Sequence, residues 1–411
     1  MQLFDSALCA KCRGRGWCKQ PCVIYDKIKD YIPKTKTHFS GASPPEIFVG
    51  RFNYPDIQAG ILSPDNSEER ETETENLSSP EIWHRQRLSI ETILTNRSKL
   101  IYGKFKTQIK KLKTNNGFVS PMQEISMAYK SVSTEFFLKK PPAKNMEINT
   151  HHPIIGNPAP LKFARLEENP KIKPKVDYLV NDTDNKAVNS IVELYRSQIQ
   201  ITNINKILST GLLGLKTQRK LVPTRWSITA VDDTISKELL KKIKYYPEIN
   251  EILLFNSEYN GNHYEILLLP DKFSFEVLEA EMNKSLWNQT GYTSVMKDYE
   301  LFYGRKSYAH DVTGAYYANR LALCEYLERI KKQATAIFFR EVSPEYYAPL
   351  GVGILREITR QAFQNPPEKF NTKQEALNKM QERLNLPIST WTNESVLLKE
   401  IGKQKKISQW F

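Results

Sequence analysis

Two apolar segments joined by Asn260-Gly261 constrain the fold of this chain more than any other feature. The stretch EILLFNSEYNGNHYEILLLP (251–270) consists of two β-rich runs with this dipeptide between them. Asn-Gly suits a two-residue hairpin turn because both of its positions take a positive φ angle. We therefore predict a β-hairpin over 251–270.

Helix-like and strand-like patterns alternate on both sides of the hairpin. Apolar residues recur at helical spacing, and the helices predicted from them span about 186–209, 313–333, 351–363, 371–383 and 393–401. The run ATAIFFREV (334–342) is typical of a buried strand, and RWSITAVDD (225–233) also resembles a short strand. This alternation predicts an α+β fold with a mixed α/β body.

The first third of the chain is expected to be mostly helical. Ser79-Pro80 suits the start of a helix over EIWHRQRLSIETIL, and a second helix is predicted over 121–138. The polar, acidic run at 63–80 and the Pro-rich stretch at 139–163 are expected to form loops. The predicted division is a cysteine-rich head (1–33), a largely helical region (34–150), the mixed α/β body (151–390) and a C-terminal helix with a flexible peptide (391–411).

The composition is that of an ordinary globular protein, with 40% hydrophobic and 26% charged residues. No stretch reaches the ~20 consecutive apolar residues of a membrane crossing, and the start MQLFDSALCAKC lacks a leader pattern, so we expect a cytoplasmic protein with no membrane partner. Lys and Arg number 59 against 46 Asp and Glu. The resulting charge of +13 favours polyanionic partners, although solubility alone also explains it.

Four of the five cysteines crowd into CAKCRGRGWCKQPC near the start of the chain. Their spacing is C-x2-C-x5-C-x3-C, and the residues are Cys9, Cys12, Cys18 and Cys22. Four thiolates satisfy tetrahedral zinc, whereas disulfides are rare in the cytosol. We therefore predict a bound zinc ion, with an iron–sulfur cluster as the alternative.

The role of this head is open on sequence grounds. It either contacts nucleic acid through Arg13, Arg15, Trp17 and Lys19, or it is a metal staple for a segment too small to form a core. The fifth cysteine, Cys324, occupies an apolar position of a predicted helix and is expected in the core.

The last eight residues, QKKISQWF, form a second local motif. In one helical turn Ile407, Trp410 and Phe411 share a face and can enter one pocket together, while Gln404 can add hydrogen bonds at its edge. This pattern resembles the PCNA-interacting peptide of replication and repair proteins. The sliding clamp PCNA is therefore the expected partner, and a terminal helix that packs on its own body is the alternative.

Charged clusters in the body supply candidates for chemistry. Asp232 and Asp233 follow a predicted strand, and Asp298 and Glu300 lie in DYELFYGRKSYAH. If the four carboxylates converge, they can hold divalent ions for phosphodiester chemistry; the alternative for the first pair is a helix cap.

Basic residues beside aromatics are candidates for contact with DNA. The cluster RKLVPTRWS suits phosphate contact with stacking on a base. The predicted nucleic-acid-binding residues are Arg219, Lys220, Arg225, Trp226, Arg305, Lys306 and Arg320. A buried Arg320 beside tyrosines would form an anion site, although a solvated arginine is commoner. Arg340, Glu341, Arg356 and Glu357 form either an ion-pair network or a site.

Several long motifs together resemble one family. They are QRKLVPTRWSITAVDD (218–233), DYELFYGRKSYAHDVTGAYYANRLALCEYL (298–327), REVSPEYYAPLGVGILREITRQA (340–362), FVGRFNYPDIQAGIL (48–62) and GNPAPLKF (156–163). With the cysteine head and the tail, they are similar to the Nre family of archaeal DNA-repair proteins over almost the entire chain. The resemblance implies a role in repair of damaged DNA linked to PCNA, and it assigns no catalytic activity. A divalent-metal nuclease or other nucleotide-processing enzyme, and a non-catalytic DNA- or RNA-binding zinc adaptor, are the alternatives.

Overall fold

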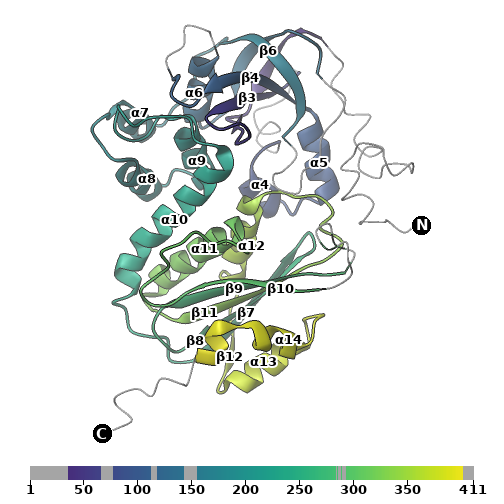
Figure 1. The fold of residues 1–411 in the computed structure, drawn as a ribbon, viewed down its shortest axis with the longest axis vertical. Helices are drawn as coiled ribbons and strands as arrows, with labels where there is room; N and C mark the ends of the chain where they lie inside the picture. Colours follow the sequence, from purple (N-terminus) through teal and green to yellow (C-terminus); the bar gives the residue numbers. More distant parts are fainter. Residues whose placement is uncertain are drawn as a thin grey trace, which may run out of the picture.

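Two six-stranded sheets organise the protein, and helices lie between them and below them (Figure 1). The computed structural model describes residues 36–65, 77–112, 118–142, 155–283, 285, 288 and 293–400. The predicted zinc-binding head and PCNA-interacting peptide lie outside these residues. Within the described part there are 12 strands and 12 helices, so the expected mixture of both element types is confirmed.

The first sheet is built from the N-terminal third of the chain and has the strand order β1-β5-β6-β4-β3-β2. Its neighbouring strands are antiparallel except for the parallel pair β4 and β6. The strands are β1 (His38–Ser43), β2 (Ile47–Val49), β3 (Asp56–Pro64), β4 (Leu100–Gln108), β5 (Val132–Leu138) and β6 (Asn157–Leu166). The helices of this region are α4 (Pro80–Arg85), α5 (Ile90–Ser98) and α6 (Val119–Met127).

A layer of helices follows the first sheet. They are α7 (Pro174–Asn181), α8 (Ala187–Arg196), α9 (Ile201–Ser209) and the long α10 (Thr224–Ile243). Apolar side chains of these helices form their own core, to which α10 contributes Val231 and Ile235 and α11 contributes Leu321. This shared core holds α10 between the other three helices of the layer and the second sheet (Figure 1).

The second sheet has the order β10-β9-β11-β8-β7-β12, and β9 and β11 are its parallel neighbours. Its strands are β7 (Ile252–Tyr259), β8 (Asn262–Leu269), β9 (Ser274–Glu281), β10 (Val295–Glu300), β11 (Thr335–Val342) and β12 (Glu368–Phe370). Its helices are α11 (Gly314–Ile330), α12 (Val352–Ala362), α13 (Lys373–Gln381), α14 (Ile388–Glu394) and α15 (Val396–Glu400).

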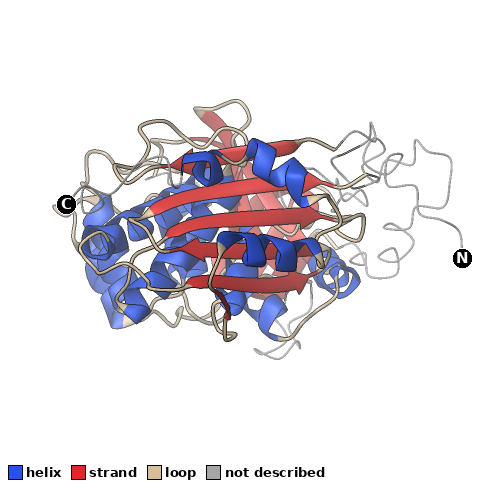
Figure 2. Cartoon of the chain, turned by 90° about the horizontal axis from the view of Figure 1, so that it is seen from below, coloured by secondary structure: helices blue, strands red, loops and turns tan. Residues whose placement is uncertain are grey.

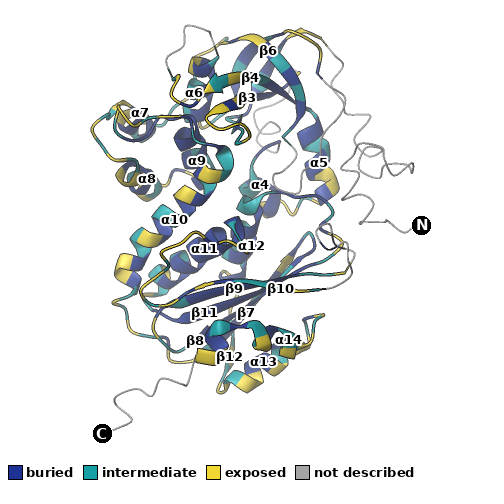
Figure 3. Cartoon of the chain, viewed as in Figure 1, coloured by how far each residue is buried: buried dark blue, intermediate teal, exposed yellow. Residues whose placement is uncertain are grey.

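Both faces of the second sheet are covered. One face packs against α10, α11 and α12, and the other packs against α13, α14 and α15. Seen from below, short helices lie across the strands (Figure 2). The strands are consequently buried along most of their length (Figure 3), as in β11, where all eight residues are buried.

The prediction of a largely helical region at 34–150 was wrong. This region supplies five strands of the first sheet, and the predicted helix 121–138 ends at Met127, after which the chain enters β5. The sequence patterns did not predict these strands because the strands contain small residues, which allow one strand to cross closely over another. A Cβ atom on Gly41 would lie 2.0 Å from the carbonyl oxygen of Pro64, so a larger side chain does not fit there.

Three other element boundaries also differ from the prediction. The stretch RWSITAVDD is part of helix α10 and not a strand, and its Val231 packs into the helical core. The Pro-rich stretch 139–163 contains the start of β6 at Asn157. The helix expected over EIWHRQRLSIETIL is divided, because Arg87 has a φ of 54° and Ser89 caps a new helix through its contact with the backbone nitrogen of Thr92.

The predictions for the C-terminal half are largely confirmed. The hairpin forms with Asn260 and Gly261 at φ angles of 49° and 73°. The helices predicted at 313–333 and 351–363 are α11 and α12, and the buried strand at 334–342 is β11. Cys324 is buried in the core, as expected.

Candidate functional site

The predicted pair Asp232 and Asp233 lies in the middle of α10, where it caps no helix. Asp232 is fully buried and accepts hydrogen bonds of 2.8 and 3.1 Å from Nη1 of Arg356 in α12. Asp233 accepts from Nη2 of Arg320 in α11 and from Lys237. The two neighbouring carboxylates therefore bind arginines of two different helices.

The second predicted pair also has partners within the protein. Glu300 accepts hydrogen bonds of 3.0 and 3.2 Å from Nη1 of Arg320. Asp298 accepts from Nη2 of Arg305 at 2.8 Å and from the backbone nitrogens of residues 310–312 at 2.8 to 3.2 Å. Asp298 thus orders the loop that leads into α11.

These contacts favour a structural role over metal binding for the four carboxylates. An arginine occupies the position beside each of them that a cation would otherwise take. The described part of the chain holds no group of three or more His, Cys, Asp and Glu side chains that could bind a metal ion. The buried arginines instead connect α10, α11, α12 and β10 in one ion-pair network.

Three of the predicted DNA-binding residues also bind groups of the protein itself. Arg219 donates to the carbonyl oxygens of Gly214, Val180 and Asp182 at 2.8 to 3.0 Å. Arg320 is buried beside Tyr316 and Tyr317, but its guanidinium is neutralised by carboxylates. Arg305 pairs with Asp298. Lys220 and Lys306 are exposed.

A large hollow lies between the two sheets, and we name it the central cleft. Its volume is about 710 Å³, which is within the usual range of ligand sites. The N-terminal sheet, α4 and α9 line one side, and the ends of β9 and β11 with the starts of α10, α11 and α12 line the other. Residues far apart in the sequence therefore meet at this cleft.

Exposed aromatic and basic side chains gather at and beside this cleft. Arg51, Phe52 and Arg225 line it, Tyr54 and Trp226 are close to lining residues in the chain, and Tyr308 contacts the lining residue Thr229. We name the set the aromatic rim: Arg51, Phe52, Tyr54, Arg225, Trp226 and Tyr308. Each of the four aromatics exposes between 40% and 62% of its surface. Tyr54 and Trp226 contact each other with ring centroids 5.1 Å apart, and Arg51 lies 5.4 Å from the Phe52 ring centroid. The rim therefore combines side chains from both parts of the molecule.

The rim is electropositive. No acidic side chain of the described residues forms an ion pair with Arg51 or Arg225, and both line the cleft. Burial lowers the pKa of Arg225, and the positive charge of Arg51 lowers it further. Two like charges without a counterion favour an anionic ligand.

The sequence identified two of the six rim residues. Arg225 and Trp226 were predicted, whereas Arg51, Phe52, Tyr54 and Tyr308 were missed. The available signal was GRFNYP (50–55), in which an arginine and two aromatics follow one another in a segment rich in turn residues. Aromatics in a tight turn have little room to be buried.

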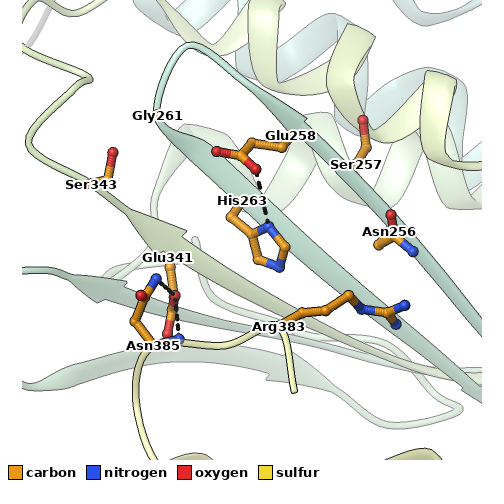
Figure 4. A pocket seen from close by; sticks show the side chains of 9 residues that line it. All are labelled: Asn256, Ser257, Glu258, Gly261, His263, Glu341, Ser343, Arg383 and Asn385. Atoms are coloured by element: carbon orange, nitrogen blue, oxygen red, sulfur yellow. Dashed lines mark hydrogen bonds and ion pairs between the residues drawn. The ribbon is translucent and has the colours of Figure 1, made fainter. Parts of the chain in front are cut away.

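A smaller hollow of about 360 Å³ lies beside the β7–β8 hairpin (Figure 4). Its charged groups are bound to other protein groups: Arg383 pairs with Glu265 at 2.8 Å, and Glu341 accepts from the backbone nitrogens of Asn385 and Leu386. His263 lies 3.0 Å from Glu265, whose hydrogen bond raises the His263 pKa although burial opposes this shift. The central cleft, where Arg51 and Arg225 form no ion pair with the described residues, is the better ligand site.

None of the helices in the described part of the chain has the length and hydropathy that a bilayer crossing requires.

Comparison with known proteins places this architecture in a family. The family model described as "Archaeal Nre, N-terminal" matches residues 18–288, and "Archaeal Nre, C-terminal" matches residues 300–410. The DNA repair protein NreB of Archaeoglobus fulgidus is 34% identical over 400 residues, covering 97% of this chain and 98% of the relative.

Two further relatives agree with this result. The DNA repair protein NreA of the same organism is 33% identical over 92% of this chain and 94% of the relative. NreA of Haloferax volcanii is 32% identical over 87% of this chain and 86% of the relative. No solved structure is significantly similar. The sequence and the match over nearly its full length therefore agree: the chain belongs to the archaeal Nre family.

Proposed function

We propose that this protein acts in DNA repair and binds unpaired DNA at the aromatic rim of the central cleft. The names of its relatives support the first part, since NreA and NreB are described as DNA repair proteins. The rim supports the second part, because its exposed aromatics lie beside two arginines that form no ion pair with an acidic side chain of the described residues.

The chemistry of the rim suits single-stranded nucleic acid. Exposed aromatic rings stack on bases of any sequence, and arginines contact the phosphates between them. Duplex DNA hides its bases within the stack, so the aromatic part of this surface would remain unused there. The overall charge of +13 adds a long-range attraction for a polyanion.

The decisive experiment measures binding of a labelled single-stranded oligonucleotide by fluorescence anisotropy. Trp226→Ala removes an exposed ring and should weaken binding about tenfold, because loss of one stacked base costs about 1–3 kcal/mol. Arg51→Ala with Arg225→Ala should weaken binding further and reduce its dependence on salt.

Matched controls are available outside the rim, just beyond the end of α10 and on α8. Tyr245 follows the other end of α10 and is 89% exposed, and Arg196 is an exposed arginine paired with Glu238. Tyr245→Ala and Arg196→Ala should leave the affinity nearly unchanged. Equal losses in the rim variants and these controls would mean that DNA contacts the protein elsewhere.

The proposal also includes the two terminal motifs predicted from the sequence. A zinc ion bound by Cys9, Cys12, Cys18 and Cys22 would order the N-terminal head. The peptide with Gln404, Ile407, Trp410 and Phe411 would attach the protein to PCNA. The rim would then act on DNA that the clamp already encircles.

A further inference from the structure

The inner wall of the central cleft has the topology of a ligand site. Strands β9 and β11 are parallel, and their last residues, Glu281 and Val342, both line the cleft. In α/β sheets, ligands bind outside the carboxyl ends of parallel strands, where the following helices begin.

Two helix N-termini meet at this wall. Helix α11 has Thr313 as its N-cap and α12 has Gly351, and neither helix receives a hydrogen bond from a capping side chain. A Cβ atom on Gly314 would lie 2.9 Å from Cγ1 of Val352, so the absence of a side chain there lets the two N-termini touch. Their dipoles add, and an anion is stabilised where they meet.

The backbone at these caps is held in an unusual conformation. Thr313 has a φ of 55° and a ψ of −123°, and Gly351 has a φ of 85°. A positive φ costs energy for a residue with a branched side chain such as threonine, and such strain clusters at binding sites.

Polar groups without partners also point to a ligand. Asn205 of α9 lines the cleft at 6% exposure, and its Oδ1 atom is buried with no hydrogen-bond partner among the described residues. A buried acceptor without a donor costs about 1–3 kcal/mol, so the protein alone leaves this site incomplete.

Glu281 adds a titratable group to the same wall. Its side chain has no hydrogen bond or ion pair with the described residues. Burial raises the Glu281 pKa to about 7, the nearby Glu279 carboxylate adds to the shift, and Arg340 opposes it. Arg340 is itself paired with Glu279.

The other groups around Glu281 are known from the strand pairing and the cleft lining. Strand β10 places the uncharged Met296 beside Glu279, and the loop before α11 contributes Asp311. The opposite wall contributes Arg51 and Lys104. Glu281 is therefore the carboxyl group at this wall that can be neutral near pH 7.

We propose that the inner wall of the central cleft binds a nucleotide, with its phosphate at the paired N-termini of α11 and α12 and its other polar groups bound by Asn205 and Glu281. This inference rests on the proposed function, because it places one nucleotide deep in the cleft at whose rim the DNA strand lies. The nucleotide is either part of that strand or a free molecule.

The first test changes the charge at the phosphate position. Thr313→Asp supplies an N-cap and a negative charge where the phosphate would lie, while Thr313→Asn supplies a cap of the same shape without charge. The probe is the dinucleotide d(TpT), titrated calorimetrically into the full-length protein. We expect Thr313→Asp to bind about tenfold more weakly than Thr313→Asn, with both folded, because one repulsive charge at contact distance costs more than 1 kcal/mol.

The second test uses pH. A phosphodiester does not titrate near neutrality, so a pH effect reports on the protein. Between one unit below and one unit above the Glu281 pKa of about 7, d(TpT) affinity should fall by up to about tenfold, since ionised Glu281 repels the phosphate. Glu281→Gln should remove this dependence and keep the higher affinity.

The source of the nucleotide follows from two further titrations. If oligothymidylate binds more tightly than d(TpT) and loses this advantage in Trp226→Ala, the nucleotide belongs to the bound strand. If thymidine monophosphate binds as tightly as d(TpT) and is insensitive to Trp226→Ala, the site takes a free nucleotide. Equal d(TpT) affinity of the two Thr313 variants, or no binding at millimolar d(TpT), would overturn the inner site while leaving strand binding at the rim intact.

Discussion

Buried arginines decide what the nearby carboxylates of this protein can do. Arg320, Arg340 and Arg356 are each at least 95% buried, and each contacts a carboxylate. Removing a guanidinium from water costs several kcal/mol, and the attraction of an ionised partner offsets this only in good geometry. Asp232 and Glu300 are therefore needed as counterions.

This role predicts a large loss of stability in Asp232→Ala. The variant leaves Arg356 buried without its main partner and should lose about 3–5 kcal/mol of unfolding free energy, measured by urea denaturation. Replacing both residues, as Asp232→Ala with Arg356→Met, should cost less than the sum of the two single changes. The exposed Asp184→Ala serves as the control and should change stability by less than about 0.5 kcal/mol. Strict additivity would argue against the ion pair.

At the scale of elements, the charge of the central cleft depends on where the helices begin more than on how long they are. Helices α10, α11 and α12 all start at the central cleft, and none has a side-chain N-cap. Their free backbone N–H groups and dipoles make this wall positive without additional lysine or arginine. Helix α12 begins there because it follows β11, which ends at the cleft beside its parallel neighbour β9. Helix α11 reaches the cleft through the loop after β10, and α10 enters it before the second sheet begins.

The cysteine-rich head is an element predicted from the sequence alone. Elemental analysis of protein purified without chelator should find one zinc ion per chain, and Cys12→Ser should lose it, because three thiolates bind zinc far more weakly than four. Cys324→Ser is the matched control, since Cys324 lies in the core of the second sheet. Iron with sulfide in place of zinc would identify a cluster, and the absence of any metal would refute the prediction.

At the scale of the whole molecule, two sheet-based units enclose one cleft. The aromatic rim needs both units, because Arg51, Phe52 and Tyr54 come from the first and Arg225, Trp226 and Tyr308 from the helical layer and the second. A tail that binds a ring around DNA would raise the local concentration of this cleft to about the millimolar range, so even weak intrinsic DNA binding would suffice.

This arrangement predicts that the tail binds PCNA independently of the folding and DNA binding of the body. Deleting 404–411 should abolish binding to PCNA in calorimetry while leaving the melting temperature and the affinity for single-stranded DNA unchanged. Replacing Trp410 and Phe411 by alanine should have the same effect, because aromatic anchors carry most of the energy of small interfaces. Replacing Lys405 by alanine should affect mainly the association rate. Unchanged PCNA affinity after the deletion would exclude the tail as the attachment site.

The sequence alone was sufficient to predict an element where the local sequence rules agree with the tertiary structure. Asn260-Gly261 specifies its hairpin because the turn needs positive φ angles, and α11, β11 and α12 have clear apolar patterns. The first sheet was not predicted because its strands contain small residues. Such residues are required only where another strand lies close by in the folded protein, as at Gly41.

The family and the two terminal motifs were determined by the sequence, since they depend on residue identity at short spacing. The site was decided by the tertiary structure. The same pattern of charges allows Asp232 to bind a metal or Arg356, and only the packing of α12 against α10 selects the arginine. Likewise, Arg51 and Arg225 are 174 positions apart by subtraction of their numbers, and their shared cleft exists because two sheets fold around it. Convergence of distant side chains depends on long-range packing, which local sequence patterns do not encode.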